Sequence, residues 1–490
     1  MSMLEFSTQI TPGLAPIILA LGALLILMLD VFIKTDWPRA GFTACFALLV
    51  LGLQLAGSCP SGTSTLLFGG FLYADGLTCF MNCLIAAILL AVIWTGGSGR
   101  RVDGIETPGE YQALLLLSAA GATVMASAAE LITLFLGLEL MSLSLYCLCA
   151  ISGRRQGAEG ALKYFILGSY SSAFFLFGMA LLYGVSGSTF LVDVQAAVPR
   201  SDVLLLRTAM GFILFGLAFK VALVPFHFWA PDAYQGAPLP VTAFMACAVK
   251  AAAFAAAIRF FFGIFPGLYQ FWSPIIWLLA LLSMLGGNLI ALRQRSITRM
   301  LAFSSIAHAG YIMTAFLAPA GQHGGAAAVL YYLCAYTLST LGAFAVLYVV
   351  SSAKPGDDKA DDLSEFYGLG YSQPMLAFAM SLFLLSLAGL PPGMAGLIGK
   401  FYVFNAAIKA GYTGLVIAGV IGSAISCGYY LRVIVLMYFA GERTIPAQSS
   451  EVSQSLLLRA VVLIAVAGII ILGVLPGGLY NVAAEAVRGL

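Results

Sequence analysis

The chain has 490 residues, of which 61% are hydrophobic and only 9% charged, with a formal net charge of +2. A soluble domain carries about 25% charged residues, so this composition excludes a water-soluble protein of this length. The basic residues occur singly or in short pairs such as Arg100–Arg101, which gives no basic surface for nucleic acid. We therefore predict an all-α integral membrane protein.

Apolar runs that are long enough to cross a bilayer recur along the whole chain. A spanning helix needs about 20 mostly apolar residues, and the runs predict about fourteen such spans. In chain order the spans are 12–33, 41–57, 71–96, 111–128, 130–151, 160–185, 203–224, 240–263, 273–292, 299–318, 325–351, 374–409 in two pieces, 412–439 and 457–479. The first run has no basic flank and no small-residue cleavage site, so we expect it to be retained.

In this predicted membrane topology, most lysine and arginine residues outside the spans lie on one side of the membrane. The residues on that side are Lys34, Arg39, Arg100, Arg101, Arg154, Arg155, Arg293, Arg295, Arg299, Lys354, Lys359 and Arg443. Loops rich in Lys and Arg face the cytoplasm. We therefore expect a multi-pass protein of a bacterial inner membrane, with both termini in the periplasm.

The nine cysteines show no spacing typical of a metal site. Cys147 and Cys149 lie one residue apart inside an apolar run. Buried free thiols are the favoured interpretation, because unpaired cysteine behaves as a small apolar side chain.

Two spans contain helix-breaking sequence, at 220–232 and at 389–400. Proline and glycine break a helix, and broken backbone inside a membrane survives only around a cavity or within protein. Such breaks in corresponding positions of two halves indicate inverted repeats around a transport site. We predict N-terminal helices over 1–110, five-helix repeats over 111–263 and 273–439, and a C-terminal helix within 440–490.

Ionisable residues inside apolar runs are costly and by default indicate function. Glu139 lies near the centre of its run, and Lys220 ends a run directly before the first break. A carboxylate and the carbonyl end of a half-helix both favour a charged lysine, whereas burial favours the neutral form. A lysine under these influences could carry a proton, and arginine could not. The alternative for Glu139 is a structural salt bridge.

Two further lysines are predicted to belong to the same relay. Lys250 lies mid-helix among alanines, and Lys400 follows the second break. Lys163 lies nearer a helix end, where a solvent-reaching lysine explains it as well as proton transfer does.

Three other groups could line or extend this path. His308 is a candidate relay because its unperturbed pKa lies near neutrality, with a core histidine as the alternative. His227 and Asp232, near the first break, could line an inlet or cap the broken helix. We find no phosphate-binding loop, nucleophile elbow or iron–sulfur motif, so the energy for pumping is expected to come from another protein.

Six stretches of the sequence together resemble the antiporter-like membrane subunits of respiratory complex I, NADH-quinone oxidoreductase, and in particular their N type. The stretches are Leu136–Tyr146, Ala161–Phe165, Phe219–His227, Trp229–Val241, Ser304–Gly310 and Gly389–Lys400. Lys400 stands where the M type usually has glutamate, and the long lateral helix of the L type is not expected.

The resemblance implies a membrane-arm subunit in which Glu139 and Lys220 act as a switch and Lys250 and Lys400 carry the proton onward. It implies no cofactor in this chain, with NADH, FMN, iron–sulfur clusters and quinone bound by other subunits. Its partners would be other membrane-arm subunits and the lipid bilayer. The open alternatives are a freestanding or multisubunit sodium(potassium)/proton antiporter and a purely structural subunit.

Overall fold

The computed structural model describes residues 3–33, 38–57, 64–96, 101–102, 105–106, 109–200, 202–319, 321, 324–352, 361–440 and 455–488. Five of the basic residues that fixed the predicted orientation lie outside this part, namely Lys34, Arg100, Lys354, Lys359 and Arg443.

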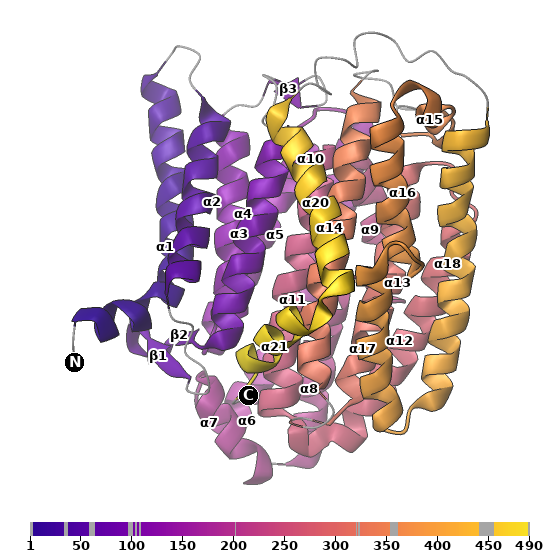
Figure 1. Cartoon of the computed structure of the whole chain (residues 1–490). Helices are drawn as coiled ribbons and strands as arrows, with labels where there is room; N and C mark the ends of the chain where they lie inside the picture. Colours follow the sequence, from indigo (N-terminus) through magenta and orange to yellow (C-terminus); the bar gives the residue numbers. More distant parts are fainter. Residues whose placement is uncertain are drawn as a thin grey trace.

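The described chain is a bundle of helices that run up and down between two ends (Figure 1). Twelve of the described helices are long and apolar enough to cross a membrane. The predicted span 111–128 corresponds to α4, and the two-piece span 374–409 corresponds to α16 followed by α17. The all-α membrane fold is therefore confirmed.

The N-terminal region contains three spans and two short hairpins. Its elements are α1 (Met3–Phe32), α2 (Arg39–Ala56), β1 (Thr65–Leu67), β2 (Leu72–Ala74), α3 (Gly76–Gly96), β3 (Arg101–Val102) and β4 (Ile105–Glu106). Both hairpins are antiparallel, with Leu66 opposite Tyr73 in the first.

Two groups of five spans follow. The first group consists of α4 (Gly109–Ser127), α5 (Leu131–Ala150), α6 (Arg155–Ser186), the short α7 (Leu191–Ala197), α8 (Val203–Lys220) with α9 (Trp229–Gly236), and α10 (Leu239–Phe244) with α11 (Lys250–Ile258). The second consists of α12 (Tyr269–Ala291), α13 (Ile297–Thr314), α14 (Gly325–Ser351), the short α15 (Leu369–Ser372), α16 (Pro374–Ala388) with α17 (Met394–Lys409), and α18 (Thr413–Phe439).

The fourth span of each group is the broken one. The first break separates α8 from α9, and the second separates α16 from α17. Because the spans alternate in direction, α4 and α12 start at opposite ends of the bundle (Figure 1). This is the inverted arrangement that the sequence pattern predicted. Each break also contains one cis X-Pro peptide bond, Val224–Pro225 and Pro391–Pro392.

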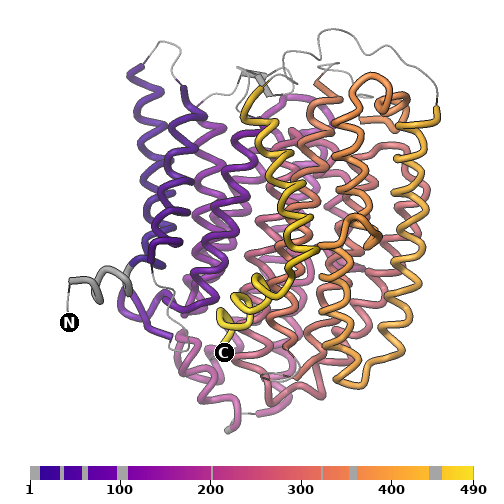
Figure 2. The backbone as a smooth tube through the Cα atoms, in the orientation of Figure 1, coloured from indigo at the N-terminus to yellow at the C-terminus, as the bar shows by residue number. Residues whose placement is uncertain are grey.

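The helices α20 (Leu456–Val474) and α21 (Pro476–Ala486) complete the chain. Figure 2 shows α20 crossing the front of the bundle obliquely, with α21 continuing toward the lower end. The C-terminal end of α21 and the first spanning turns of α1 lie at this same end, which we call the terminal end (Figure 1).

The centre of the bundle is formed by the span from Leu239 to Ile264 and by α13 with its continuation to Leu317. Both are wholly buried over their most apolar stretch, whereas α18 and α20 are only one-third buried. A π-helical segment, Met245–Val249, directly precedes Lys250. The central span therefore carries an irregular backbone at the position of a predicted relay lysine.

The expectation that the cysteines are buried free thiols is confirmed for Cys149 and Cys247, whereas the free Cys83, Cys334 and Cys427 are only half-buried, and it is wrong for three others. Cys79, in the first turn of α3, is disulfide-bonded, and Cys45 and Cys147 are exposed on helix surfaces. Surface cysteines are compatible with a membrane protein because lipid covers its apolar helix faces. The apolar runs in the sequence could not distinguish a lipid-facing position from a core position.

Candidate functional site

Lys220 is buried in the last turn of α8 and is 1% exposed. Its Nζ donates a hydrogen bond to Ser142 Oγ on α5 at 2.6 Å. The rings of Tyr146 and Tyr164 lie 6.0 and 5.8 Å from Nζ and provide electron-rich faces for the ammonium group. The helix ends at Lys220, so its last carbonyls add partial negative charge beside this cation.

Glu139 lies one turn of α5 before Ser142, but it does not form an ion pair with Lys220. Within the described residues, no carboxylate oxygen lies within 4.0 Å of Lys220 Nζ. Glu139 instead accepts a hydrogen bond from Ser172 of α6, and its side chain is partly exposed at the outer surface of the bundle. The predicted partners are neighbours that interact through space, each held by its own serine.

Lys250 lies in the centre of the bundle and is 2% exposed. Its Nζ donates to the backbone carbonyl of Ser305 on α13 and lies 5.6 Å from the centre of the Tyr336 ring. Tyr336 in turn donates to Ser305 Oγ at 2.9 Å, and Tyr234 of α9 interacts with the same side chain. Lys250 thus has a dipolar partner and an aromatic face in place of a carboxylate.

Lys250 contacts α13, and α13 contributes to a cluster of hydroxyl and imidazole groups near this contact. His308 is 4% exposed; its Nδ1 is 2.8 Å from Tyr332 Oη and its Nε2 is 3.4 Å from Tyr430 Oη. Ser304 shares a short hydrogen bond with Tyr430. The predicted histidine therefore lies between two tyrosines one turn from Lys250's carbonyl partner.

Lys400 is reached through a second row of polar groups. Tyr429 donates to Asn288 Oδ1 at 2.9 Å, and Asn288 Nδ2 lies 2.8 Å from Tyr311 Oη. The Tyr311 ring centre is 4.8 Å from Lys400 Nζ. Lys400 itself is 4% exposed and donates to the carbonyl of Ala388, the last residue of α16, at 2.7 Å.

Lys220 and Lys400 both belong to broken helices. Lys220 is the last residue of the half-helix α8, and the Lys400 ammonium donates to the last carbonyl of the half-helix α16, where the helix dipole is negative. The break is what exposes these carbonyls, because a continuous helix would bond them internally. Each break therefore has a buried lysine beside it.

The connection between Lys220 and Lys250 is less complete. The Tyr164 hydroxyl is fully buried beside Lys220 and has no hydrogen-bond partner in the described part of the chain. The Tyr164 ring stacks on Trp229 of α9 with centroids 4.1 Å apart. A buried polar group of this kind is the usual partner of an internal water molecule.

Lys163 and Asp232 form an ion cluster at the end of the bundle opposite to the termini. Lys163 Nζ lies 2.6 Å from Glu159 and 2.7 Å from Asp232, and Arg299 of α13 lies 2.6 Å from the other oxygen of Asp232. The Lys163 side chain is 43% exposed, so it is not part of the buried row. Asp232 joins the first repeat to the second through Arg299.

His227 lies inside the first break and is 8% exposed. Its ring stacks on Phe228 at 4.6 Å and approaches Phe303 of α13 at 6.4 Å. It is therefore packed between the break and the second repeat, on the side where Asp232 lies. No group of three His, Cys, Asp or Glu side chains among the described residues could hold a metal ion.

Sequence reasoning missed the polar groups that contact the predicted relay residues or lie between them. They are Ser142, Ser172, Asn288, Tyr311, Tyr332, Tyr336, Tyr429 and Tyr430. The available signal was a lone asparagine in an apolar run, and serine, histidine and tyrosine spaced by three or four residues on one helix, which places them on one face.

Asn288→Leu is expected to lower proton translocation about tenfold, because it breaks the row between Tyr429 and Tyr311 and a proton-transfer group contributes at least that much. Translocation is measured in proteoliposomes with a pH-sensitive dye. Asn82→Leu is the matched control: this buried asparagine donates to Pro12 O at 2.9 Å, away from the lysines. Equal translocation by the two variants would remove Asn288 from the path.

Comparison with known proteins places this arrangement in a family. Residues 128–426 match the family described as NADH:quinone oxidoreductase/Mrp antiporter, TM. NADH-quinone oxidoreductase subunit N of Trichlorobacter lovleyi is 40% identical over 480 residues, covering 96% of each chain. The subunit N of Myxococcus xanthus is 39% identical over 501 residues, covering 95% of each chain.

Solved structures give the same result. A chain of respiratory complex I from Thermus thermophilus with bound aureothin superposes with a TM-score of 0.80 at 36% identity, covering 96% of this chain and 99% of that one. A chain of the Mrp complex from Dietzia shares the fold, with a TM-score of 0.82 at 22% identity over 98% and 97% of the two chains. The chain therefore belongs to the NADH:quinone oxidoreductase/Mrp antiporter transmembrane family.

Proposed function

We propose that the chain is the proton-translocating N-type subunit of a bacterial NADH-quinone oxidoreductase. The observation that carries the proposal is the row of three buried lysines, none paired with a carboxylate among the described residues, with polar side chains between the last two. A purely structural buried cation would be expected to have an ionic partner, because an unpaired buried charge is costly. The near-full-length relatives named subunit N support the same assignment.

In this proposal the proton enters from the cytoplasmic end and reaches Lys220. The Asp232 ion cluster and His227 line the inlet. Lys220 is held charged by the α8 carbonyl end, by Ser142 and by the field of Glu139. When Glu139 moves toward a neighbouring subunit at the surface it partly faces, Lys220 loses part of this stabilisation and releases its proton toward Lys250. Water at the Tyr164 hydroxyl bridges the gap.

From Lys250 the proton passes along the hydroxyls and imidazole of α13 and its neighbours. His308 can accept at one ring nitrogen and donate from the other, which suits a relay between Tyr332 and Tyr430. The row through Asn288 leads to Lys400. From there the proton leaves toward the terminal end. The α16 carbonyls then favour the charged form of Lys400, so that it accepts the next proton.

The terminal end is proposed to face the periplasm. Cys79 lies at this end, at the start of α3, and is disulfide-bonded. Disulfides persist in the oxidising periplasm and are rare in the cytosol. This is independent of the loop charges and agrees with them.

Redox chemistry is assigned to other subunits that bind NADH, FMN, iron–sulfur clusters and quinone. The partners are other membrane-arm subunits, and the exposed apolar residues of α5 and α6 around Glu139, such as Leu136 and Leu143, suit contact with a neighbouring membrane helix. The chain itself supplies the proton path, and electron transfer elsewhere supplies the energy.

A freestanding or multisubunit cation/proton antiporter would use the same buried groups, and the family includes Mrp antiporters. The distinguishing experiment is gentle solubilisation of native membranes followed by native electrophoresis. We expect the chain to co-migrate with NADH:quinone reductase activity. Migration away from that activity, together with sodium- or potassium-driven proton flux by the purified chain, would replace the proposal with the antiporter function.

A further inference from the structure

A serine of α16 bridges the second break. Ser386 lies two residues before the end of α16 and is fully buried. Its Oγ accepts a hydrogen bond from the backbone N–H of Gly396, in the first turn of α17, at 3.2 Å. The first N–H groups of a helix have no partner within that helix, and Gly393, which precedes α17, has no side chain to cap them. Ser386 therefore supplies from α16 a cap that α17 lacks.

This contact differs from the usual bond of a serine inside a helix. Ser381 of the same helix donates to the carbonyl of Ala377, one turn before it, at 2.8 Å, which is the ordinary local bond. The Ser386 hydroxyl instead contacts two other helices. Besides Gly396 of α17, the hydroxyl of Ser339 on α14 lies 2.8 Å from Ser386 Oγ. Ser386 thus joins α14, α16 and α17 at one buried point.

The two half-helices approach each other too closely for a side chain at the contact. A Cβ added at Gly396 would lie 1.8 Å from the Ser386 carbonyl oxygen, and one added at Gly393 would lie 2.2 Å from Ser386 N. Cβ atoms are not found this close to backbone atoms, so both positions require glycine. The start of α17 therefore packs directly on the last turn of α16, and the bond from Gly396 to Ser386 fixes this contact.

The same two segments carry Lys400 and its hydrogen-bond acceptor. Lys400 lies one turn of α17 after Gly396, and the Ala388 carbonyl, which accepts from Lys400 Nζ at 2.7 Å, lies two residues after Ser386. Because residues four apart lie on one face of a helix, the same face of α17 carries both contacts with α16. Separation of α17 from α16 at Ser386 would therefore also withdraw the Ala388 carbonyl from the ammonium group.

We infer that Ser386 is a positioning residue for Lys400, because its hydroxyl holds α17 against α16 so that the α16 carbonyl end stays at the ammonium group. The inference rests on the proposed role of Lys400 in proton translocation. A carbonyl at hydrogen-bond distance favours the charged amine, whereas burial favours the neutral amine. The distance from Lys400 to Ala388 therefore controls how readily Lys400 binds and releases a proton.

The test measures proton translocation by proteoliposomes that contain the assembled complex, with NADH as the driver. Ser386→Ala is expected to lower translocation about tenfold, because a displaced proton carrier loses at least this factor in transfer rate. Ser381→Ala is the matched control on the same helix and should leave translocation unchanged. Ser386→Cys keeps a side chain of similar shape with a weaker acceptor, so its translocation should fall between those of the wild type and Ser386→Ala.

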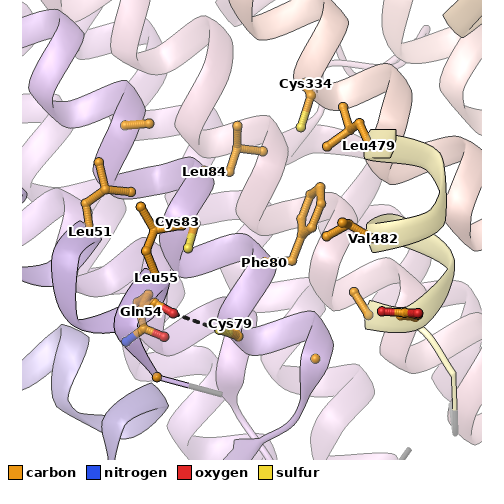
Figure 3. A pocket seen from close by; sticks show the side chains of 15 residues that line it. Leu51, Gln54, Leu55, Cys79, Phe80, Cys83, Leu84, Cys334, Leu479 and Val482 are labelled. Carbon is orange, nitrogen blue, oxygen red and sulfur yellow. Dashed lines mark hydrogen bonds between the residues drawn. The ribbon is translucent and has the colours of Figure 1, made fainter. Parts of the chain in front are cut away.

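The contact with α14 gives a second and milder variant. Ser339→Ala removes one partner of the Ser386 hydroxyl and leaves the Gly396 bond, so translocation should fall only about threefold. Cys334→Ala is its control on α14, because the Cys334 side chain lines a lateral apolar cavity together with Leu479 of α21 (Figure 3). This control should leave translocation unchanged.

The solvent deuterium isotope effect on translocation separates positioning from a purely structural role. Slower proton transfer at a displaced Lys400 should increase this isotope effect in Ser386→Ala. A packing defect would instead lower the amount of assembled complex on a native gel and leave the isotope effect unchanged, and that result would overturn the inference. Equal translocation by Ser386→Ala and Ser381→Ala would overturn it as well.

Lys400→Met is measured in the same series, so that failure of the inference can be told from failure of the proposed function. Normal translocation by Lys400→Met would remove Lys400 from the proposed proton path, and the role of Ser386 with it. Lost translocation by Lys400→Met, together with normal translocation by Ser386→Ala, would overturn the role of Ser386 alone.

Discussion

Lys250→Met is expected to reduce proton translocation about 100-fold while leaving the bundle folded. Lys250 lies in the wholly buried central span and is the middle lysine of the proposed path. Methionine has a similar length and no charge, so it fills the same space among the alanines of α11. The polar partner left behind is the Ser305 carbonyl. Losing one hydrogen bond to it costs about 1–3 kcal/mol, which a bundle of this size tolerates.

The measurement is proton uptake by proteoliposomes that contain the assembled complex, with NADH as the driver and helicity by circular dichroism as the folding check. Lys409→Met is the matched control, because Lys409 lies on α17, exposed at the end of the helix that carries Lys400. Undiminished translocation by Lys250→Met would exclude Lys250 as a proton carrier.

Lys250→Arg separates proton transfer from a structural need for positive charge. Arginine keeps the cation and does not release its proton. If the charge only held helices together, arginine would restore translocation; in the proposed relay it blocks translocation as methionine does. Lys220→Arg and Lys400→Arg extend the same comparison to the two half-helix ends.

The membrane fold could be predicted from the sequence because its determinants are local. Each span is an apolar run, and each break is marked by proline or glycine within a few residues. Lys220, Lys250 and Lys400 could be identified for the same reason, since a charge inside an apolar run is visible without any contact information.

Contacts between helices could not be predicted in this way. Asn288 belongs to α12, Tyr429 to α18 and Tyr311 to α13, and their meeting depends on how three helices pack. The hydrogen-bond partners of Glu139 and Lys220 could not be predicted for the same reason: they are two serines, on α6 and α5. A single sequence contains the residue types but not the distances that decide between partners.

Arg259 is the buried charge that sequence reasoning overlooked. It lies in the π-helical end of the central span, at 3% exposure, and pairs with Asp75 at the start of α3. Its Nη1 and Nη2 lie 2.8 and 3.0 Å from the two Asp75 oxygens, Nη2 also donates to Thr78 Oγ1, and Nε donates to Ala126 O. Through these bonds the guanidinium group holds α3, α4 and the central span together at the terminal end.

Arg259→Met is expected to destabilise the protein by about 3–5 kcal/mol, because Asp75 is left as an unpaired buried charge. The free energy of unfolding is measured in mixed micelles by circular dichroism. Asp75→Leu combined with Arg259→Met should recover most of the loss, since replacing both members of a buried pair with apolar residues is often neutral. Arg207→Met, on the exposed face of α8, should change stability by less than about 1 kcal/mol.

A double variant no more stable than Arg259→Met would mean that Arg259 acts through Thr78 and Ala126 and not mainly through Asp75. Either result keeps this cluster distinct from the relay. Its cation has bidentate carboxylate contacts and cannot exchange protons, whereas the three lysines have carbonyl, hydroxyl and aromatic partners and can. The difference in partners is the physical reason why one buried cation is assigned to stability and the other three to proton transfer.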